Sequence, residues 1–231
     1  MAIPLYLAKT AAEFAQIAKQ PEHLAWMACH FSPYGTGITN LPSMLPKNSL
    51  LILNDRTPVH GHDPNRVKDT VDAIVEQQKC CGVLLDFQRP DLPETTQIIR
   101  ELLSLPCPVC VSALYAKGLD CPVFLPPVPL TATVEEHLAP WQDREIWLET
   151  ALESLQCRVT EKGSVFTPNA MPISPKQKES HMHCHYHIDI EENSAMFTIW
   201  RTTGDLQELL LEAERYGVKQ AVGLWQELKC K

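Results

Sequence analysis

The stretch Gly82-Val83-Leu84-Leu85-Asp86-Phe87-Gln88 predicts a buried strand that ends in a carboxylate and an amide. Side chains alternate along a strand, so Leu84, Asp86 and Gln88 share one face. In enzymes built on parallel strands, the carboxyl end of a strand is where chemistry usually takes place. An amide such as Gln88 can orient a ligand, but it cannot donate a proton as an acid. The segment therefore predicts a site at this strand end in which Gln88 is not the catalytic acid.

Further apolar strands and helical segments alternate about eight times along the chain, which favours a compact (β/α)₈ barrel of the TIM type with several outer helices shortened. An open doubly wound sheet is the alternative fold. No glycine-rich phosphate loop follows any predicted strand, which disfavours nucleotide binding. An antiparallel hairpin insertion is expected over about residues 157–194, before the last βα units of a single domain, 1–231. The predicted strands are residues 24–31, 49–54, 82–87, 109–114, 123–125, 145–149 and 220–225.

Composition narrows the classes of partner. The 231 residues carry a formal net charge of −8 and are 45% hydrophobic, which fits a globular domain and argues against nucleic acid or an anionic membrane as a partner. The first residues do not form a signal peptide, and no apolar run is long enough to span a membrane, so we expect a cytoplasmic protein. The nine cysteines are expected to be reduced, and the sequence predicts no cofactor.

Two motifs resemble glycoside hydrolase family 18, the chitinase-like barrels. The stretch 81–88 is similar to the family's third-strand pattern D-G-x-D-x-D-x-E, and it matches that pattern at Gly82, Asp86 and the aromatic Phe87. Residues 223–227 (G-L-W-Q-E) are similar to the family's eighth strand, whose Trp forms the floor of the sugar site. Cys81, Leu84 and Gln88 depart from the pattern, and Gln88 stands where the family has its catalytic Glu.

The resemblance implies a glycosidase fold without standard chitinase activity. In the family, the Glu protonates the leaving oxygen while the nearby Asp positions the acetamido group of the substrate, which is the internal nucleophile. Because general acid catalysis contributes roughly 10²–10⁴-fold, replacement of that Glu by Gln88 removes the main catalytic step. We expect a barrel that binds a carbohydrate or another small ligand without hydrolysing it.

The candidate ligand-binding residues all lie at predicted strand ends, where aromatic, amide and carboxylate side chains suit the apolar faces and hydroxyl edges of a sugar. They are Tyr34, Asn54, Asp86, Gln88, Tyr115, Glu149, Trp225 and Gln226, with His30, Asp55 and Arg201 as further strand-end residues. A single Trp such as Trp225 is more often a core residue than a platform for a sugar, and Asn54 and Asp55 are also consistent with a turn.

Histidines at alternate positions from His181 to His187 would share one face of a strand, which brings His183 and His185 within reach of one metal ion. The loop 60–63 (H-G-H-D) offers a second group of potential ligands. The simpler interpretation is that the histidines form the polar face of an amphipathic hairpin, and that Asp63 caps a helix.

Two other functions stay open. The chain could be an active hydrolase of another type that uses Asp86, Glu149 or a histidine-bound metal, which predicts a perturbed pKa in the cleft. It could also be a structural or interaction protein whose partner surface lies in residues 157–201. That function predicts an exposed apolar patch or a dimer interface in the hairpin region.

Overall fold

A closed barrel of eight parallel strands forms the body of the protein. The computed structural model describes residues 3–16, 19–35, 37–89, 93–168, 170, 172 and 176–228. The first strand pairs with both the second and the last, which closes the sheet and confirms the predicted (β/α)₈ barrel. The barrel strands are β1 (Leu5–Lys9), β2 (Leu24–Phe31), β4 (Leu50–Asn54), β5 (Gly82–Asp86), β6 (Val109–Ser112), β7 (Val123–Leu125), β8 (Ile146–Thr150) and β14 (Val218–Leu224). A two-residue strand, β3 (Ile38–Thr39), pairs antiparallel with β2.

The outer helices differ strongly in length, as expected for a compact barrel. The longest is α2 (Pro64–Gln78), which begins as predicted with Asp63 as the N-cap, its side chain accepting the N–H of Asn65 at 2.9 Å. The others are α1 (Ala11–Ala15), α3 (Pro93–Leu102), α4 (Ala113–Ala116), α5 (Val134–Leu138), α6 (Thr203–Ala213) and α7 (Trp225–Leu228), with 3₁₀ turns at Ala139–Trp141 and Glu214–Tyr216. Among the described helices, none is both long and apolar enough to cross a membrane.

The barrel interior is filled by side chains below its open end. Trp147 is fully buried there and packs against Gly82, where a Cβ would lie 3.1 Å from the Trp147 ring. A second apolar layer separates the strands from α2 and α3. Because the lower interior is packed, the polar side chains of the next layer lie at the carboxyl ends of the strands.

Strand β1 was not predicted, so the strand that carries Asp86 is the fourth of the barrel and not the third. Local pattern does not reveal β1, because it is short and ends in Lys9, a charged residue that is nevertheless fully buried. Lys9 Nζ lies 4.0 Å from the centre of the Trp225 ring. Trp225 was predicted to end the last strand, but the strand stops at Leu224 and Trp225 begins α7.

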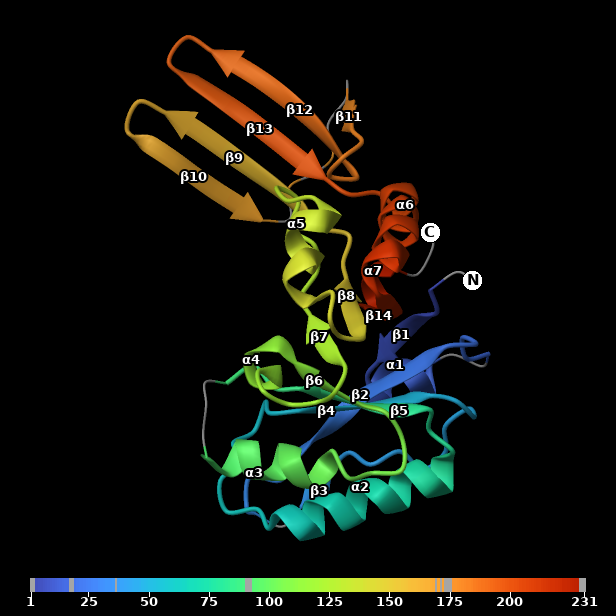
Figure 1. Ribbon diagram of the computed structural model, residues 1–231. Helices are drawn as coiled ribbons and strands as arrows, with labels where there is room; N and C mark the ends of the chain where they lie inside the picture. The colour runs from blue at the N-terminus through green and yellow to red at the C-terminus, as the bar shows by residue number, and fades with distance from the viewer. Residues whose placement is uncertain are drawn as a thin grey trace.

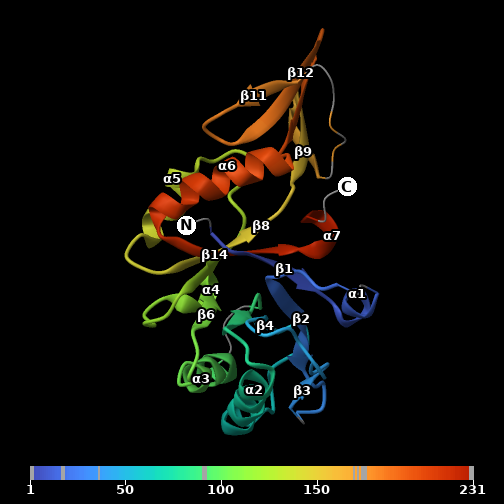
Figure 2. The same ribbon diagram turned by 90° about the vertical axis from the view of Figure 1, so that its right-hand side faces the viewer.

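The predicted hairpin insertion forms one five-stranded antiparallel sheet between β8 and α6. Figures 1 and 2 show this sheet at the opposite end of the molecule from α2 and α3. It covers a wider range than the predicted insertion, from Ser154 to Trp200. Its strands, in spatial order, are β10 (Gly163–Pro168), β9 (Ser154–Thr160), β13 (Ser194–Trp200), β12 (Cys184–Glu191) and β11 (Gln177–Glu179).

Candidate functional site

Two adjoining cavities lie at the carboxyl ends of the barrel strands. The outer one has a volume of about 650 Å³ and the inner one about 60 Å³, and both are lined by Met27, Asn54 and Asp86. We call them together the mouth cavity. Its outer part is also lined by His30, Asn40, Asp55, Arg56, Gln88 and Arg89, and its inner part by Leu84, Phe124, Glu149 and Val222, among others.

Strand register brings Asn54 and Asp86 together. They are direct partners in the parallel pair β4–β5, two residues beyond the inward-facing pair Ile52 and Leu84, so both side chains point into the mouth. The Asn54 amide is held in place: its Nδ2 donates to the Met27 carbonyl at 3.4 Å, and its Oδ1 accepts the N–H of Arg56 at 3.1 Å.

The amide of Gln88 is bonded to Asp86. Gln88 Nε2 donates to Asp86 Oδ1 at 2.5 Å. A carboxylate oxygen can only accept here, so the bond fixes which way the amide points, and it leaves Gln88 Oε1 as an acceptor and the second N–H of Nε2 as a donor for a ligand. Burial raises the pKa of Asp86 above its ordinary value, the bond from Gln88 lowers it, and the nearby charge of Asp55 raises it.

Three side chains from neighbouring strand ends hold the backbone that carries Gln88. Asp55, which is buried, accepts the N–H of Gln88 at 3.0 Å and that of Arg89 at 2.8 Å. Ser112 Oγ donates to the carbonyl of Phe87 at 2.7 Å, and Tyr115 OH donates to that of Arg89 at 2.6 Å. The position of Gln88 is thus fixed before any ligand arrives.

Glu149 faces the inner part of the mouth cavity from β8. Burial raises its pKa to about 7, and the charges of Asp86, Glu227 and Glu153 add to the increase. Glu149 is therefore partly protonated near neutral pH, so it can donate as well as accept a hydrogen bond. The burial of Glu153 raises its pKa too.

The predicted aromatic residues do not line the mouth cavity. Tyr34 is 86% exposed in the loop after β2, and Tyr115 packs behind Phe87 with a ring distance of 6.3 Å. Trp225 covers Lys9, which also donates to Gln20 at 2.9 Å, and burial lowers the pKa of Lys9. Gln226 is exposed on α7. Of the predicted ligand-binding residues, the structure gathers Asn54, Asp86, Gln88 and Glu149.

The predicted histidine strand is only partly formed. Strand β12 begins at Cys184, so His181 and His183 lie in the turn before it, and His183 has a left-handed backbone with φ of 48°. His183 Nε2 lies 2.7 Å from Glu212, and His185 Nδ1 lies 2.8 Å from Asp205, so each imidazole pairs with a carboxylate of α6. Within the described ranges, no three His, Cys, Asp or Glu side chains are grouped to hold a metal ion.

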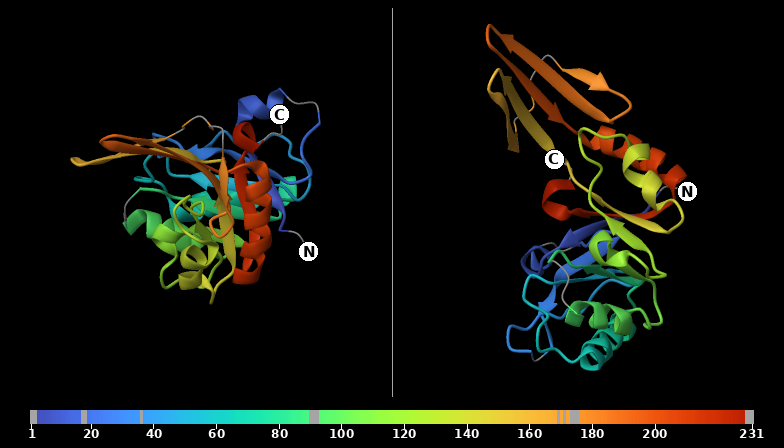
Figure 3. Two further views of the ribbon diagram at one scale, coloured as in Figure 1. Left: turned by 90° about the horizontal axis from the view of Figure 1, so that it is seen from above. Right: turned by 60° about the vertical axis from the view of Figure 1, so that its left-hand side comes forward.

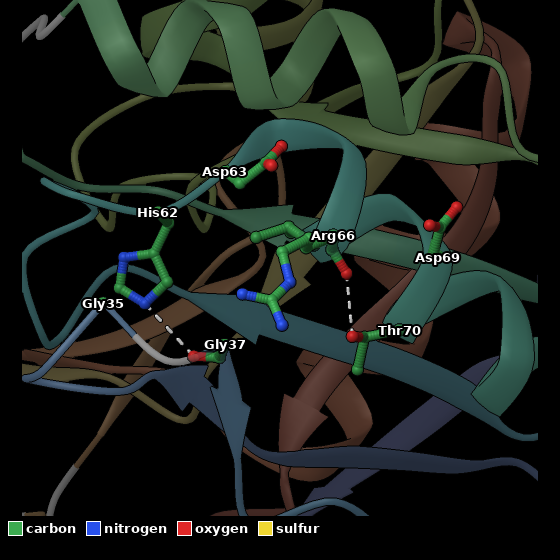
Figure 4. A pocket seen from close by; sticks show the side chains of 8 residues that line it. Gly35, Gly37, His62, Asp63, Arg66, Asp69 and Thr70 are labelled. Atoms are coloured by element: carbon green, nitrogen blue, oxygen red, sulfur yellow. Dashed lines mark hydrogen bonds between the residues drawn. The ribbon is translucent and has the colours of Figure 1, made fainter.

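The predicted histidine loop lines a separate cavity of about 260 Å³ at the start of α2, shown in Figure 4. The ring nitrogens of His62 lie 2.9 Å from the Val59 carbonyl and 3.1 Å from that of Gly37, so this histidine joins two loops. His60 is exposed beside Glu94. Arg201, also predicted at a strand end, is buried and donates to the backbone carbonyls of Val128, Met182 and His183.

Sequence patterns did not single out several residues of the site. Met27 lies on an apolar strand without a distinguishing feature, and Arg56 and Arg89 follow strand ends in loops that look like ordinary surface. Glu227 influences Glu149 only because β14 pairs with β8, whereas Glu153 lies four residues after Glu149 in the chain. The sequence offered one indication for Glu153 and Glu227: they follow β8 and β14, and the segments after the carboxyl ends of barrel strands surround the mouth.

The fold is similar to that of solved glycosidase-like barrels. The spore cortex-lytic enzyme SleL of Bacillus cereus is 9% identical with a TM-score of 0.58, over 96% of this chain and 70% of that one. A chitinase of Chromobacterium violaceum is 9% identical with a TM-score of 0.57, over 96% and 93%. SleL of Bacillus megaterium is 10% identical with a TM-score of 0.55, over 96% and 70%.

The chain has the (β/α)₈ barrel fold that these structures share. Models of known families and curated sequences gave no match to it. The likeness in structure therefore concerns the fold, and function has to be argued from the mouth cavity itself.

Proposed function

We propose that this barrel binds a carbohydrate in the mouth cavity and does not cleave it by the family-18 route. The observation that carries the proposal is the bond between Gln88 and Asp86 at the end of β5. In the family pattern that the sequence resembles, the position of Gln88 belongs to the proton donor. An amide offers a hydrogen bond to the glycosidic oxygen but no proton, so binding is retained and acid catalysis is lost.

The shape and chemistry of the cavity support a sugar as the ligand. A volume of about 650 Å³ is in the usual range for small-molecule sites. The polar groups are held by other side chains and by the backbone before binding, which lowers the entropy lost when a ligand binds. Amides, carboxylates and His30 supply both donors and acceptors, as the hydroxyl groups of a sugar require.

A hydrolase that uses Glu149 is the second candidate, and one observation favours it. A carboxyl with a pKa of about 7 in the inner cavity has the acidity of a general acid at neutral pH, and Asp86 lines the same cavity. In this case the acid would come from the seventh barrel strand and not from the fourth.

A binding screen tests the proposal. The probes are chito-oligosaccharides and fragments of spore cortex, which the chitinase and the cortex-lytic enzyme of similar fold suggest. A ligand at 100 times its Kd stabilises the protein by about 2.7 kcal/mol, which raises its melting temperature clearly. We expect such a rise for wild type but not for Asp86→Ala. Asp189→Ala, which removes an exposed carboxylate from the second sheet, is the control and should retain the rise.

Product analysis separates the two candidates. With a bound oligosaccharide, wild type should release no shorter product over hours, and Gln88→Glu should gain measurable release. Release by wild type that is lost in Glu149→Gln would establish the second candidate. A protein that binds no probe would contradict the proposal.

A further inference from the structure

The five-stranded sheet has one almost entirely apolar face. In an antiparallel pair, directly opposed residues point to the same side, so the register defines the face. One row runs from Ile188 through Phe197 and Cys157 to Phe166. Together with the rows on either side, the apolar face carries Leu155, Cys157, Val159, Phe166, Cys184, Tyr186, Ile188, Ile190, Ala195, Phe197 and Ile199, with Ser164, Pro168, Gln177 and Glu179 on its two edge strands.

Much of the apolar face is in contact with solvent. The exposed fractions are 83% for Ile190, 61% for Phe166, 41% for Ile188 and 39% for Val159. Near the barrel, the loop at Leu130 borders a groove of about 310 Å³ on this face. Beyond it, Figures 1 and 3 show no described helix or strand lying over β9, β10, β12 and β13.

The opposite face of the sheet is polar and partly covered. It carries His185, His187 and Asp189 on β12, and Arg158 on β9. Helix α6 packs at its base, where His185 pairs with Asp205. An antiparallel sheet is stable with one face in water when the other is buried, so the apolar face is the one that requires a second layer.

Area and charge favour a second copy of the chain as that layer. Four strands of six to eight residues and the three-residue β11, about 4.8 Å apart and with about 3.4 Å per residue, present on the order of 500 Å² per face. Two such faces together reach the roughly 1,000 Å² in total that a specific interface needs. Among the described residues, this face carries one charged side chain, Glu179 at the barrel end of β11. Its outer part over β9, β10, β12 and β13 is uncharged, so two such parts meet without opposing like charges although each chain carries −8.

We propose that two copies of the chain associate through this face, with their five-stranded sheets packed against each other as in a β-sandwich. Stacked sheets lie about 10 Å apart with strands inclined by about 30°. Such packing buries Phe166, Ile188 and Ile190 of both copies. The proposal does not depend on the carbohydrate site, which lies at the mouth of the barrel.

Strand β10 offers a matched pair of substitutions for the test. Phe166 and Val165 are neighbours with similar exposure, 61% and 66%, but only Phe166 belongs to the apolar face. Sedimentation equilibrium of the full chain, over about 1 to 100 µM in reducing buffer, should show a dimer in equilibrium with monomer. Phe166→Glu and Ile188→Glu should weaken the dimer at least about tenfold, and Val165→Glu less than about threefold.

Each alternative result overturns the proposal. A monomer at every concentration would leave the face to another occupant, and a dimer weakened equally by Val165→Glu would place the contact elsewhere. Far-ultraviolet circular dichroism shows whether the variants are folded. If Phe166→Glu does not fold, alkylation of Cys157 in wild type gives the answer, because its rate should fall as protein concentration rises. A rate independent of concentration would contradict the dimer.

Discussion

Asp55 Oδ1 accepts the backbone N–H of Gln88 at 3.0 Å, and its Oδ2 accepts that of Arg89 at 2.8 Å. One buried carboxylate at the end of β4 therefore holds the segment after β5 that forms one wall of the mouth cavity. The side chain most relevant to the proposed function, Gln88, is placed by a residue of the neighbouring strand.

Replacement of Asp55 should destabilise the protein. Asp55→Ala leaves two N–H groups without their acceptor, so the free energy of unfolding should fall by about 2–4 kcal/mol. Asp55→Asn retains one acceptor oxygen and should lose less. Urea denaturation measures both variants. If both lie within about 0.5 kcal/mol of wild type, the carboxylate does not hold this segment.

The raised pKa of Glu149 predicts how stability depends on pH. Its carboxyl titrates near 4.5 in the unfolded chain and at about 7 in the folded one, so the folded state holds more protons between these values. Stability is then lost as pH rises through this window, on the order of 3 kcal/mol for this one group. Glu149→Gln should remove this pH-dependent loss of stability, because the Gln side chain does not ionise.

Urea denaturation of wild type and Glu149→Gln at pH 4, 6 and 8 checks this. The variant should gain stability relative to wild type as pH rises, and most of the gain should come between pH 5 and 7. Differences that do not change with pH would show that Glu149 titrates normally in the folded protein.

The buried guanidinium of Arg201 should be important for the attachment of the second sheet. It donates to the carbonyls of Val128 at 2.9 Å, His183 at 3.1 Å and Met182 at 3.3 Å. Arg201→Met keeps much of the stem but leaves these carbonyls without a donor, which should cost about 2–4 kcal/mol. Arg158→Met, which removes an exposed ion pair with Glu191, should cost at most about 1 kcal/mol. Equal losses in the two variants would contradict this role.

Gly223 lies opposite Thr150 in the pair of barrel strands β14 and β8. A Cβ there would lie 2.5 Å from Thr150 Oγ1 and 2.9 Å from the Thr150 carbonyl. We expect Gly223→Ala to destabilise the protein by about 1–3 kcal/mol. Gly204→Ala is the control, because its nearest neighbour would be 3.7 Å away and α6 gains a better helix former. Thermal unfolding compares the stability of the two variants. If Gly223→Ala does not change stability, β8 can shift to make room for the added methyl group.

Local sequence patterns predicted the parts of the fold that depend on local physics. The apolar run of β4, the strand that ends at Asp86 and the Asp63 cap of α2 all follow from period, propensity and capping chemistry. The amphipathic hairpins were also predicted, with the histidines as the polar face. Asn54 and Asp86 were expected at the carboxyl edge because parallel strands place their ends together.

The features that the sequence did not reveal depend on contacts between residues that are far apart in the chain. Strand β1 forms around Lys9, whose burial depends on Trp225 from the far end of the chain. Tyr115 was expected to line the mouth cavity, but it lies behind the cavity wall, where its hydroxyl group donates to the Arg89 carbonyl. His183 and His185, which the sequence offered as possible metal ligands, pair instead with carboxylates of α6, a helix that no local pattern places beside them.

The most direct test of the account is calorimetric titration of a chito-oligosaccharide into wild type and into Asp86→Ala. Saturable binding to wild type that is weakened at least about tenfold in the variant is the predicted result. If wild type gives no heat of binding with any chito-oligosaccharide or cortex fragment, or binds them as tightly after Asp86→Ala, the mouth cavity is not a carbohydrate site.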